Sequence, residues 1–378
     1  MKKRMRILLI FGGRSAEHDV SCVSAVGAAI ALDRDRYEVV PVGITRTGEW
    51  LLATNTQKFL AGDRKNVPAS FAVEGISVIG PSTPGRRTLS LLDPTLDVGD
   101  LSFDVALPLL HGPFGEDGTI QGLFELADAP YVGSGVVGSA VAMDKIIMKR
   151  AFMAEKLAVS DWLPFRAGSD GAAALAGAEL RFGYPMFIKP AGLGSSIGIS
   201  KVTSKAEFKP ALDRAWEYDE WAIVEEGVVG REIEVAILGD NPPVASVPGE
   251  IIPGSDFYSY DDKYIDNSAE LLAPASLASE LVTEVQDLAS RAFLACRCEA
   301  MARVDFFYED KRNDGSPGRG FLVNEVNTIP GFTPISMYPR LWEESGLSYS
   351  ALLDRLIALA IERHARRTER ANRSTATS

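Results

Sequence analysis

Short apolar runs alternate with segments of helical spacing along the first third of the chain. Residues 6–11 and 37–45 are apolar runs of strand length, and residues 21–32 between them have helical spacing. A further apolar run covers residues 103–112, and a helical segment follows at 118–129. This order predicts βαβ units and a parallel sheet, whose ligands gather at the carboxyl ends of the strands.

The pattern after residue 133 predicts two further units, over residues 134–226 and 227–366. The elements expected in them are helices at 138–158, 205–215, 278–296 and 348–367, and strands at 185–190, 199–202, 221–226 and 231–239. Small polar residues at 367–378 predict a disordered tail. The first unit, residues 1–133, contains a Pro- and Gly-rich stretch from Asn66 to Gly99 that we expect to be an irregular insertion.

Four polar side chains lie in two strand-like runs between residues 301 and 327. Arg303 and Asp305 occupy the first run, and Glu325 and Asn327 the second. The polar stretch 310–320 between them predicts a hairpin, and residues two apart on a strand point to one face. Carboxylate and amide oxygens suit Mg²⁺, and a guanidinium beside them suits chemistry on phosphates and oxyanions. Ordinary charges on solvated strands are disfavoured, because apolar flanks imply burial, where charges need partners.

Composition narrows the class of protein. The 378 residues suffice for two or three domains, and 46% of them are hydrophobic, as in globular proteins. A net charge of −12 argues against general affinity for nucleic acid or anionic membranes. The spacing of the three cysteines fits neither a zinc site nor a disulfide framework, which favours a reducing cytosol. No apolar run approaches membrane-spanning length.

A loop rich in glycine and serine, residues 190–198, follows the strand that ends at Lys189. Its backbone N–H groups suit a phosphate, although the glycine spacing matches neither a P-loop nor a dinucleotide fingerprint. A flexible hairpin turn is an equal alternative. Lys145 begins a helix and would reach the same phosphate if that helix faces the loop. Otherwise Lys149 and Arg150 indicate a solvated basic face.

Other segments have both a functional and a structural interpretation. Glu225–Val228 is a strand-end linker of the kind that contacts adenine, with Glu232 near enough for a ribose, but a β-bend with surface acids is favoured from these residues alone. The aromatic, charged stretch 258–267 is either a lid or a surface loop. Glu17 either binds an ammonium group or caps a helix. His111, in a second glycine-rich loop, is either catalytic or orients a neighbour.

Together and in order, these segments resemble the ATP-grasp ligases, and specifically the D-alanine–D-alanine ligases. The resemblance extends from about Arg6 to about Arg363, and its motifs are GGRSAEHDVS, HGPFGEDGTIQG, MDK, KPAGLGSSIG, DDKYID, RVDFF and NEVNTIPGFTPIS. It implies an α/β fold, α+β in the ATP-grasp part. The implied domains are a Rossmann-like N-terminal substrate domain and two ATP-grasp subdomains, with ATP held between the subdomains.

The resemblance also implies a role for each matching residue. ATP would be bound by Lys145, Lys189, Ser195, Ser196, Glu225, Glu226, Val228, Glu232 and Lys263. Two Mg²⁺ (or Mn²⁺) ions would be held by Asp305, Glu325 and Asn327. The catalytic set would be Glu17, His111, Ser195, Tyr264, Arg303, Gly331 and Ser336. Within it, Glu17 would bind the amino group of the first D-alanine, and Arg303 with the Gly331 N–H would stabilise the oxyanion. Ser336 and Met337 would hold the second D-alanine, and Ser195 and Tyr264 would connect Glu17 to the lid.

The implied activity is ATP-dependent ligation of two D-alanines through a D-alanyl phosphate intermediate. The resemblance also implies that the product serves peptidoglycan synthesis, that the protein is located in a bacterial cytoplasm and that it forms a homodimer. D-lactate or D-serine as acceptor is the first alternative. Tyr264 favours an amine, because relatives that use D-lactate usually lack this tyrosine. A nucleotide-binding module without catalysis is disfavoured by the intact Arg303, Asp305, Glu325 and Asn327. A nicotinamide-dependent oxidoreductase is disfavoured by the missing glycine fingerprint.

Overall fold

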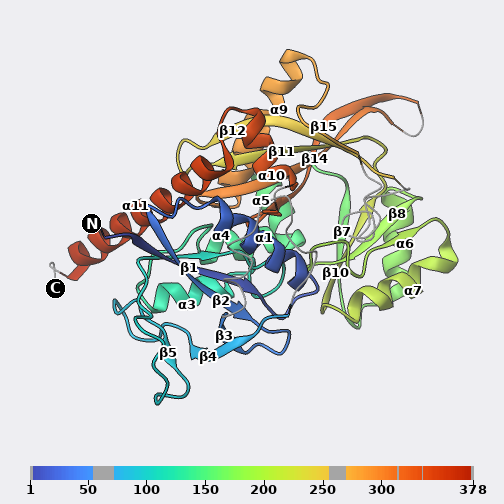
Figure 1. The fold of residues 1–378 in the computed structure, drawn as a ribbon. Coiled ribbons are helices and arrows are strands. Elements are labelled where there is room, and N and C mark those ends of the chain that lie inside the picture. Colours follow the sequence, from blue (N-terminus) through green and yellow to red (C-terminus); the bar gives the residue numbers. More distant parts are fainter. Residues whose placement is uncertain (1–2, 54–71, 255–269, 313–314, 334, 376–378) are drawn as a thin grey trace.

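The computed structural model describes residues 3–53, 72–254, 270–312, 315–333 and 335–375. Within these residues the strands form three sheets, of six, four and five strands. Each sheet is formed by one part of the chain, and we call them the N-terminal, central and C-terminal sheets (Figure 1). No described helix is long and apolar enough to cross a membrane.

The N-terminal sheet has the strand order β5-β4-β3-β2-β1-β6. Its strands are β1 (Met5–Gly12), β2 (Tyr37–Ile44), β3 (Trp50–Ala53), β4 (Gly75–Ile79), β5 (Ser90–Leu91) and β6 (Val105–Pro108). The predicted parallel pairing is confirmed, because β1 pairs in parallel with both β2 and β6. The almost fully buried apolar run of β1 is typical of a central parallel strand. Helices α1 (His18–Ala31) and α3 (Thr119–Leu126) complete this part.

The stretch from Asn66 to Gly99 is more regular than the sequence predicts. Its described residues contribute β4 and β5, which continue the sheet by antiparallel pairing with β3 and with each other. The free edge of β3 offers backbone hydrogen bonds to even a short β run, and these bonds order a segment whose composition favours turns.

The helix predicted over residues 138–158 is two helices, α4 (Val136–Met143) and α5 (Lys145–Ala154). Asp144 lies between them in an extended conformation, and its carboxylate accepts hydrogen bonds from the backbone N–H groups of Ile146 and Ile147, both at 2.9 Å. It therefore caps α5. Both helices pack against β15 (Pro317–Asn327) of the C-terminal sheet, so the boundaries at residues 133 and 226 stay predictions.

The central sheet has the order β7-β10-β8-β9, and all its pairings are antiparallel. Its strands are β7 (Trp162–Arg166), β8 (Met186–Pro190), β9 (Ser200–Val202) and β10 (Trp221–Glu226). Helices α6 (Gly171–Arg181) and α7 (Lys205–Trp216) pack on the face that carries Ala222 and Val224. Because side chains alternate along a strand, Ile223 and Glu225 of β10 point to the opposite face, where Ile223 packs against Ile146 of α5.

The C-terminal sheet has the order β13-β12-β11-β14-β15 and is antiparallel throughout. Its strands are β11 (Arg231–Leu238), β12 (Val244–Ile252), β13 (Glu270–Leu272), β14 (Met301–Lys311) and β15 (Pro317–Asn327). Val304 and Phe306 share one apolar core with helix α9 (Ser279–Ala295). The alternation along β14 therefore turns Arg303 and Asp305 to the other face of the sheet.

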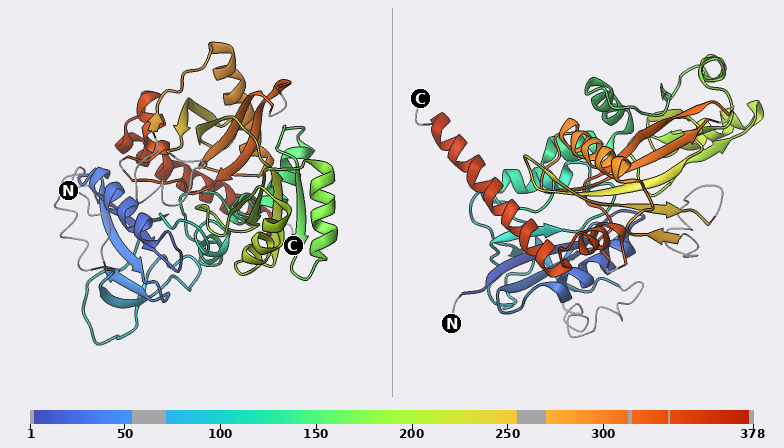
Figure 2. Two further views of the ribbon diagram at one scale, coloured as in Figure 1. Left: turned by 90° about the vertical axis from the view of Figure 1, so that its right-hand side faces the viewer. Right: turned by 90° about the horizontal axis from the view of Figure 1, so that it is seen from above.

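Helix α10 (Met337–Glu344) and the long helix α11 (Tyr349–Thr375) connect the C-terminal sheet to the N-terminal sheet. Their buried residues form one apolar core with α1 and β1, and α11 runs across the molecule (Figure 2). The phenol of Tyr37 on β2 donates a 2.7 Å hydrogen bond to Asp354 of α11. This shared core fixes the N-terminal sheet against the face of β14 that carries Arg303.

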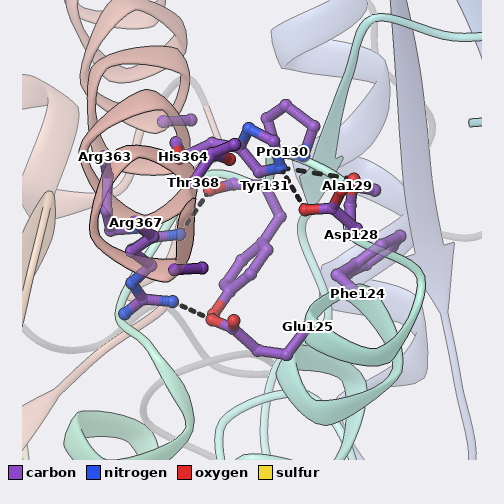
Figure 3. Close-up of a pocket in the computed structure, with 12 residues that line it drawn as sticks. Phe124, Glu125, Asp128, Ala129, Pro130, Tyr131, Arg363, His364, Arg367 and Thr368 are labelled. Atoms are coloured by element: carbon purple, nitrogen blue, oxygen red, sulfur yellow. Dashed lines mark hydrogen bonds and ion pairs between the residues drawn. The ribbon is translucent and has the colours of Figure 1, made fainter. Parts of the chain in front are cut away.

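The tail predicted to be disordered from residue 367 is helical as far as Thr375. Arg367 forms ion pairs with Glu125 and, at 2.9 Å, with Glu299. Arg363, His364 and Arg367 face Glu125 and Asp128 across a pocket of about 320 Å³ (Figure 3). These contacts stabilise helical turns whose own composition has little apolar surface to bury.

Candidate active site

Glu17 stands at the start of α1, directly after the glycine turn that follows β1. Its side chain is 8% exposed and accepts a hydrogen bond from the hydroxyl of Ser195, on the glycine- and serine-rich loop of the central sheet. Gly112 leaves room for this carboxylate, because a Cβ there would lie 2.6 Å from Glu17 Oε2. The predicted contact between Ser195 and Glu17 is therefore present.

The loop 190–198 is held against the start of α5. The backbone N–H of Lys145 donates to Ala191 O at 3.0 Å, and its ammonium donates to Leu193 O. Helix α5 thus faces the loop, which is the condition for Lys145 to reach a phosphate bound there. Ser195 and Ser196 both have positive φ, 51° and 59°, a backbone that side chains rarely adopt and that functional loops often contain.

Three charges lie on the face of the central sheet that α5 covers: Glu225 and Lys149 are buried, and the side chain of Lys189 is 12% exposed. The Glu225 carboxylate is 2.8 Å from Lys189 Nζ and 3.2 Å from Lys149 Nζ. Burial raises the pKa of Glu225, but the two lysines outweigh it and hold that pKa at about 2. The sequence interpretation of Lys149 as part of a solvated basic face is wrong, because Lys149 is fully buried and also donates to Ser160 Oγ at 3.1 Å.

The predicted hairpin brings the four polar residues of β14 and β15 together. Arg303 pairs with Asn327 and Asp305 with Glu325 in the ladder. The Arg303 guanidinium binds both oxygens of Asp305 at 2.7 Å, and Asn327 Nδ2 donates to Asp305 Oδ2 at 2.9 Å. Two carboxylates and an amide are a donor set that suits Mg²⁺. No group of three or more His, Cys, Asp or Glu suited to a metal occurs among the described residues.

Sequence analysis missed Glu234 of β11, which is the second partner of Arg303. It is 4% exposed, pairs with Asp305 in the ladder, and its Oε1 lies 3.2 Å from Arg303 Nε. Burial alone would lower the pKa of Arg303, but Asp305 and Glu234 raise it well above its usual value. The charge of Arg303 is therefore fixed between two carboxylates. The alternation in REIEV was the available signal, since it puts a second carboxylate on one buried face.

The loop after β15 is held from both sides by the glycine-rich loop that contains His111. His111 Nδ1 contacts Ile329 O at 2.9 Å, and its Nε2 contacts Ser24 Oγ at 3.0 Å. Glu116 accepts from the Ile329 N–H at 3.0 Å and from the Gly112 N–H at 2.9 Å. Burial lowers the pKa of His111, so the ring is neutral. Of the two interpretations of His111, the geometry supports the one in which it orients a neighbour.

Glu116 makes the stability of this contact dependent on pH. Burial and the nearby Glu17 raise its pKa from 4.5 to about 8. A carboxyl with a raised folded-state pKa contributes stability below its unfolded pKa and loses it as the pH rises through the folded value. We therefore expect the unfolding free energy in urea to fall between pH 4.5 and 8 by more in the parent chain than in Glu116→Gln. Equal falls in the two proteins would contradict this assignment.

The loop from Thr328 to Ser336 carries the other predicted catalytic groups. A Cβ on Gly331 would lie 2.9 Å from Ser336 Oγ, so any larger residue would require the serine side chain to move. Ser336 Oγ accepts from the Thr333 N–H at 3.1 Å. Met337 begins α10 and is buried. Only Pro330 separates Gly331 from Ile329, so the contacts of His111 and Glu116 hold the backbone next to the Gly331 N–H.

The predicted adenine and ribose residues lie between the end of β10 and the start of β11. Glu226 accepts from the Asp161 N–H at 2.7 Å and pairs with Arg319, while Val228 and Glu232 are half-buried. The predicted lid residues Lys263 and Tyr264 lie outside the described residues.

Segments from all three sheets therefore meet, and together they carry most of the predicted site residues. The N-terminal sheet supplies Glu17, the central sheet supplies Ser195 beside Lys145 and Lys189, and the C-terminal sheet supplies the hairpin and the Gly331 loop. A loop suited to a phosphate, oxygen donors suited to a metal, and an arginine that contacts one of those donors are the features of a ligase of the ATP-grasp class. Comparison with known proteins narrows that class.

The chain belongs to the D-alanine–D-alanine ligase family. The family models described as D-ala D-ala ligase N-terminus and C-terminus match residues 6–134 and 152–358. The D-alanine–D-alanine ligase of Natranaerobius thermophilus is 44% identical over 96% of both chains, and ligase A of Escherichia coli K12 is 41% identical over 96% of this chain and 97% of its own.

Solved structures confirm the ATP-grasp fold. The D-alanine–D-alanine ligase of Coxiella burnetii superposes with a TM-score of 0.83 at 34% identity and covers 99% of both chains. The D-Ala:D-Ser ligase VanG of Enterococcus faecalis superposes with a TM-score of 0.80, also at 34% identity, over 95% of this chain and all of its own. The α/β fold with an ATP-grasp part that the sequence predicts is therefore correct.

Proposed function

We propose that the chain ligates two D-alanines to D-alanyl-D-alanine, with ATP converted to ADP and phosphate. The observation that carries the proposal is the meeting of three loops. Glu17 contacts Ser195 of the glycine-rich loop, and the loop of Glu116 contacts the backbone that leads to Gly331. In this proposal a group for the substrate ammonium, a loop for the transferred phosphate and an N–H for the oxyanion would lie close together, as formation of an acyl phosphate and its aminolysis require.

We propose that the chain has three domains, over residues 1–133, 134–226 and 227–366. The nucleotide would lie between the second and third of them, which contain the central and C-terminal sheets. Lys145, Lys189 and Ser196 would contact its phosphates. The adenine would lie against the linker Glu225–Val228, and Glu232 would accept from the ribose hydroxyls. Lys263 would approach the γ-phosphate from the lid, and Tyr264 would fasten the lid over the intermediate, which water would otherwise hydrolyse.

Asp305, Glu325 and Asn327 would hold two Mg²⁺ (or Mn²⁺) ions. Their oxygen donors fit a hard cation, and the ladder places Asp305 opposite Glu325. Bound there, the ions would neutralise the charge that develops on the transferred phosphoryl group.

In the proposed reaction Glu17 binds the ammonium of the first D-alanine, whose carboxylate attacks the γ-phosphate to give D-alanyl phosphate and ADP. Ser336 and Met337 orient the second D-alanine, whose free amine attacks the acyl carbon. Arg303 and the Gly331 N–H stabilise the oxyanion, and phosphate leaves. His111 and Glu116 position the Gly331 loop. The product would be used in peptidoglycan synthesis in a bacterial cytoplasm. The enzyme would act as a homodimer.

The direct test is phosphate release from ATP with D-alanine, compared with L-alanine. We expect release with D-alanine only, because the side chain and ammonium of an L-enantiomer cannot occupy the same two subsites. Mixed reactions with D-alanine plus D-lactate or D-serine, resolved by product mass, identify the acceptor. No release of phosphate with D-alanine would overturn the proposal. If the mixed product exceeds D-alanyl-D-alanine, the acceptor is D-lactate or D-serine instead. The similarity to a D-Ala:D-Ser ligase is the reason for including D-serine.

A further inference from the structure

Arg319 of β15 connects the two parts of the chain that would enclose the nucleotide. Its Nε and Nη2 donate to the two oxygens of Glu309 on β14, at 2.7 and 2.9 Å. Its Nη1 donates to Glu226, the second residue of the linker Glu225–Val228. One planar guanidinium is thus shared by a carboxylate of the hairpin and a carboxylate of the linker, which is the geometry in which arginine is most directional.

The linker end of this contact is fixed to the central sheet. The Oε1 atom of Glu226 that pairs with Arg319 also accepts from the Asp161 N–H at 2.7 Å, and the Glu226 N–H donates to Asp161 O at 2.9 Å. The next N–H, of Gly227, donates to Pro185 O at 2.9 Å. Arg319 therefore connects the hairpin to a segment that is itself hydrogen-bonded to the central sheet.

The hairpin end is part of the ladder that carries the reaction groups. Glu309 pairs with Gly320, and four residues earlier on β14 Asp305 pairs with Glu325. At about 3.3 Å per residue, the two positions are about 13 Å apart along the strand. The same two strands thus carry the predicted metal ligands at one end and the contact to the linker at the other.

Arg319, Glu309 and Glu226 form a charged cluster that is largely shielded from water. The side chains of Glu309, Glu226 and Arg319 are 4%, 18% and 22% exposed, so water screens the cluster less than an ordinary surface pair. The hydrogen bonds from Arg319 hold the pKa of Glu309 below its usual value, and the two carboxylates raise the pKa of Arg319. Glu309 and Arg319 are therefore both ionised at neutral pH.

We infer that Arg319 is a positioning residue for the nucleotide, because it sets the distance between the linker Glu225–Val228 and the reaction end of the hairpin. The inference rests on the proposed function, in which the linker contacts adenine and the hairpin serves the phosphates. A cluster that only stabilised the fold would lower the unfolding free energy without a selective effect on nucleotide affinity. The two roles therefore differ in a measurable way.

The test is the affinity of Arg319→Met for ADP with Mg²⁺, measured by calorimetry. We expect affinity to fall about tenfold, the size expected for loss of a hydrogen bond between charged groups. The KM for ATP should rise by a similar factor, while the KM for D-alanine and the kcat at saturating ATP stay unchanged. Arg319→Lys keeps the charge but loses the planar fork, so its ADP affinity should be intermediate.

Arg312→Met is the matched control. Arg312 lies at the same end of the hairpin, is 45% exposed, and approaches Glu309 only to 3.8 Å, so its loss should leave ADP affinity unchanged. Unchanged affinity in Arg319→Met, or an equal loss in both variants, would overturn the inference. If Arg319→Met does not fold, unchanged affinity in Arg319→Lys overturns it. The ADP titration needs no turnover, so it stays informative even if the parent chain releases no phosphate with D-alanine.

Discussion

The Arg303→Ala variant is expected to lose turnover by at least about 10²–10³-fold and to bind ADP nearly as well as the parent chain. Arg303 is held between Asp305 and Glu234, on the face of β14 that looks toward the N-terminal sheet. In the proposed reaction its guanidinium acts on the oxyanion and not on the nucleotide. The measurements are kcat for D-alanine-dependent phosphate release at saturating substrates, and ADP affinity by calorimetry.

Two further variants separate chemistry from folding. Arg303→Lys keeps a positive charge but cannot bind two carboxylates with one planar group, so its kcat should lie between those of the parent and the alanine variant. Arg312→Ala, at the other end of the same hairpin, should keep the parental kcat. Urea unfolding checks that loss of the counter-ion of Asp305 and Glu234 has not unfolded the chain. Near-parental turnover of Arg303→Ala would show that Arg303 has another role.

The hairpin could be predicted because its information is local. Arg303, Asp305, Glu325 and Asn327 alternate with apolar residues, and two such runs joined by a polar stretch have one simple pairing. The register itself, with Asp305 opposite Glu325 and two irregularities further along the ladder, is seen only in the structure. The parallel pairing of β1 follows from its long apolar run.

The groups that sequence analysis missed depend on contacts between distant segments. Lys149 sits beside Arg150 in a run that has the composition of a solvated helix face, and only the packing of α5 against the central sheet buries it against Glu225. Glu116 looks like a loop residue until its contact with Ile329, 213 positions away, is seen. Arg319 falls in the stretch 310–320, which the sequence predicts to be a loop. In the structure β15 begins at Pro317, so Arg319 lies on a strand.

The cases of Lys149 and Arg319 share a physical cause. A charged side chain is predicted to be exposed because burial of an isolated charge is costly, and the prediction fails when a partner from another sheet offsets that cost. In this chain such partners lie where the sheets meet, which is also where the proposed substrates bind. The residues that local patterns misplace are therefore concentrated around the site.

The Glu225→Gln variant is expected to lose about 3–5 kcal/mol of unfolding free energy, the cost of leaving buried charge without its counter-ion. Glu225 lies between Lys149 and Lys189, so its neutralisation leaves two ammonium groups facing each other. Urea unfolding at pH 7, followed by tryptophan fluorescence, measures the loss. Three of the five tryptophans, Trp162, Trp216 and Trp221, lie on β7, α7 and β10, so most of the fluorescent side chains belong to the part of the chain that contains Glu225.

Removal of a lysine should have a much smaller effect than removal of the carboxylate. Lys149→Met leaves Glu225 paired with Lys189 at 2.8 Å, a neutral pair, and replaces an ammonium by an apolar group of similar length. The double variant Glu225→Gln/Lys149→Met should regain part of the stability lost in Glu225→Gln, because it removes one of the two facing charges. Lys209→Met, which breaks an exposed pair with Asp213, should cost less than about 1 kcal/mol. If Glu225→Gln and Lys209→Met lose equal free energy, the three charges do not act as a unit, and Glu225 is retained for the nucleotide alone.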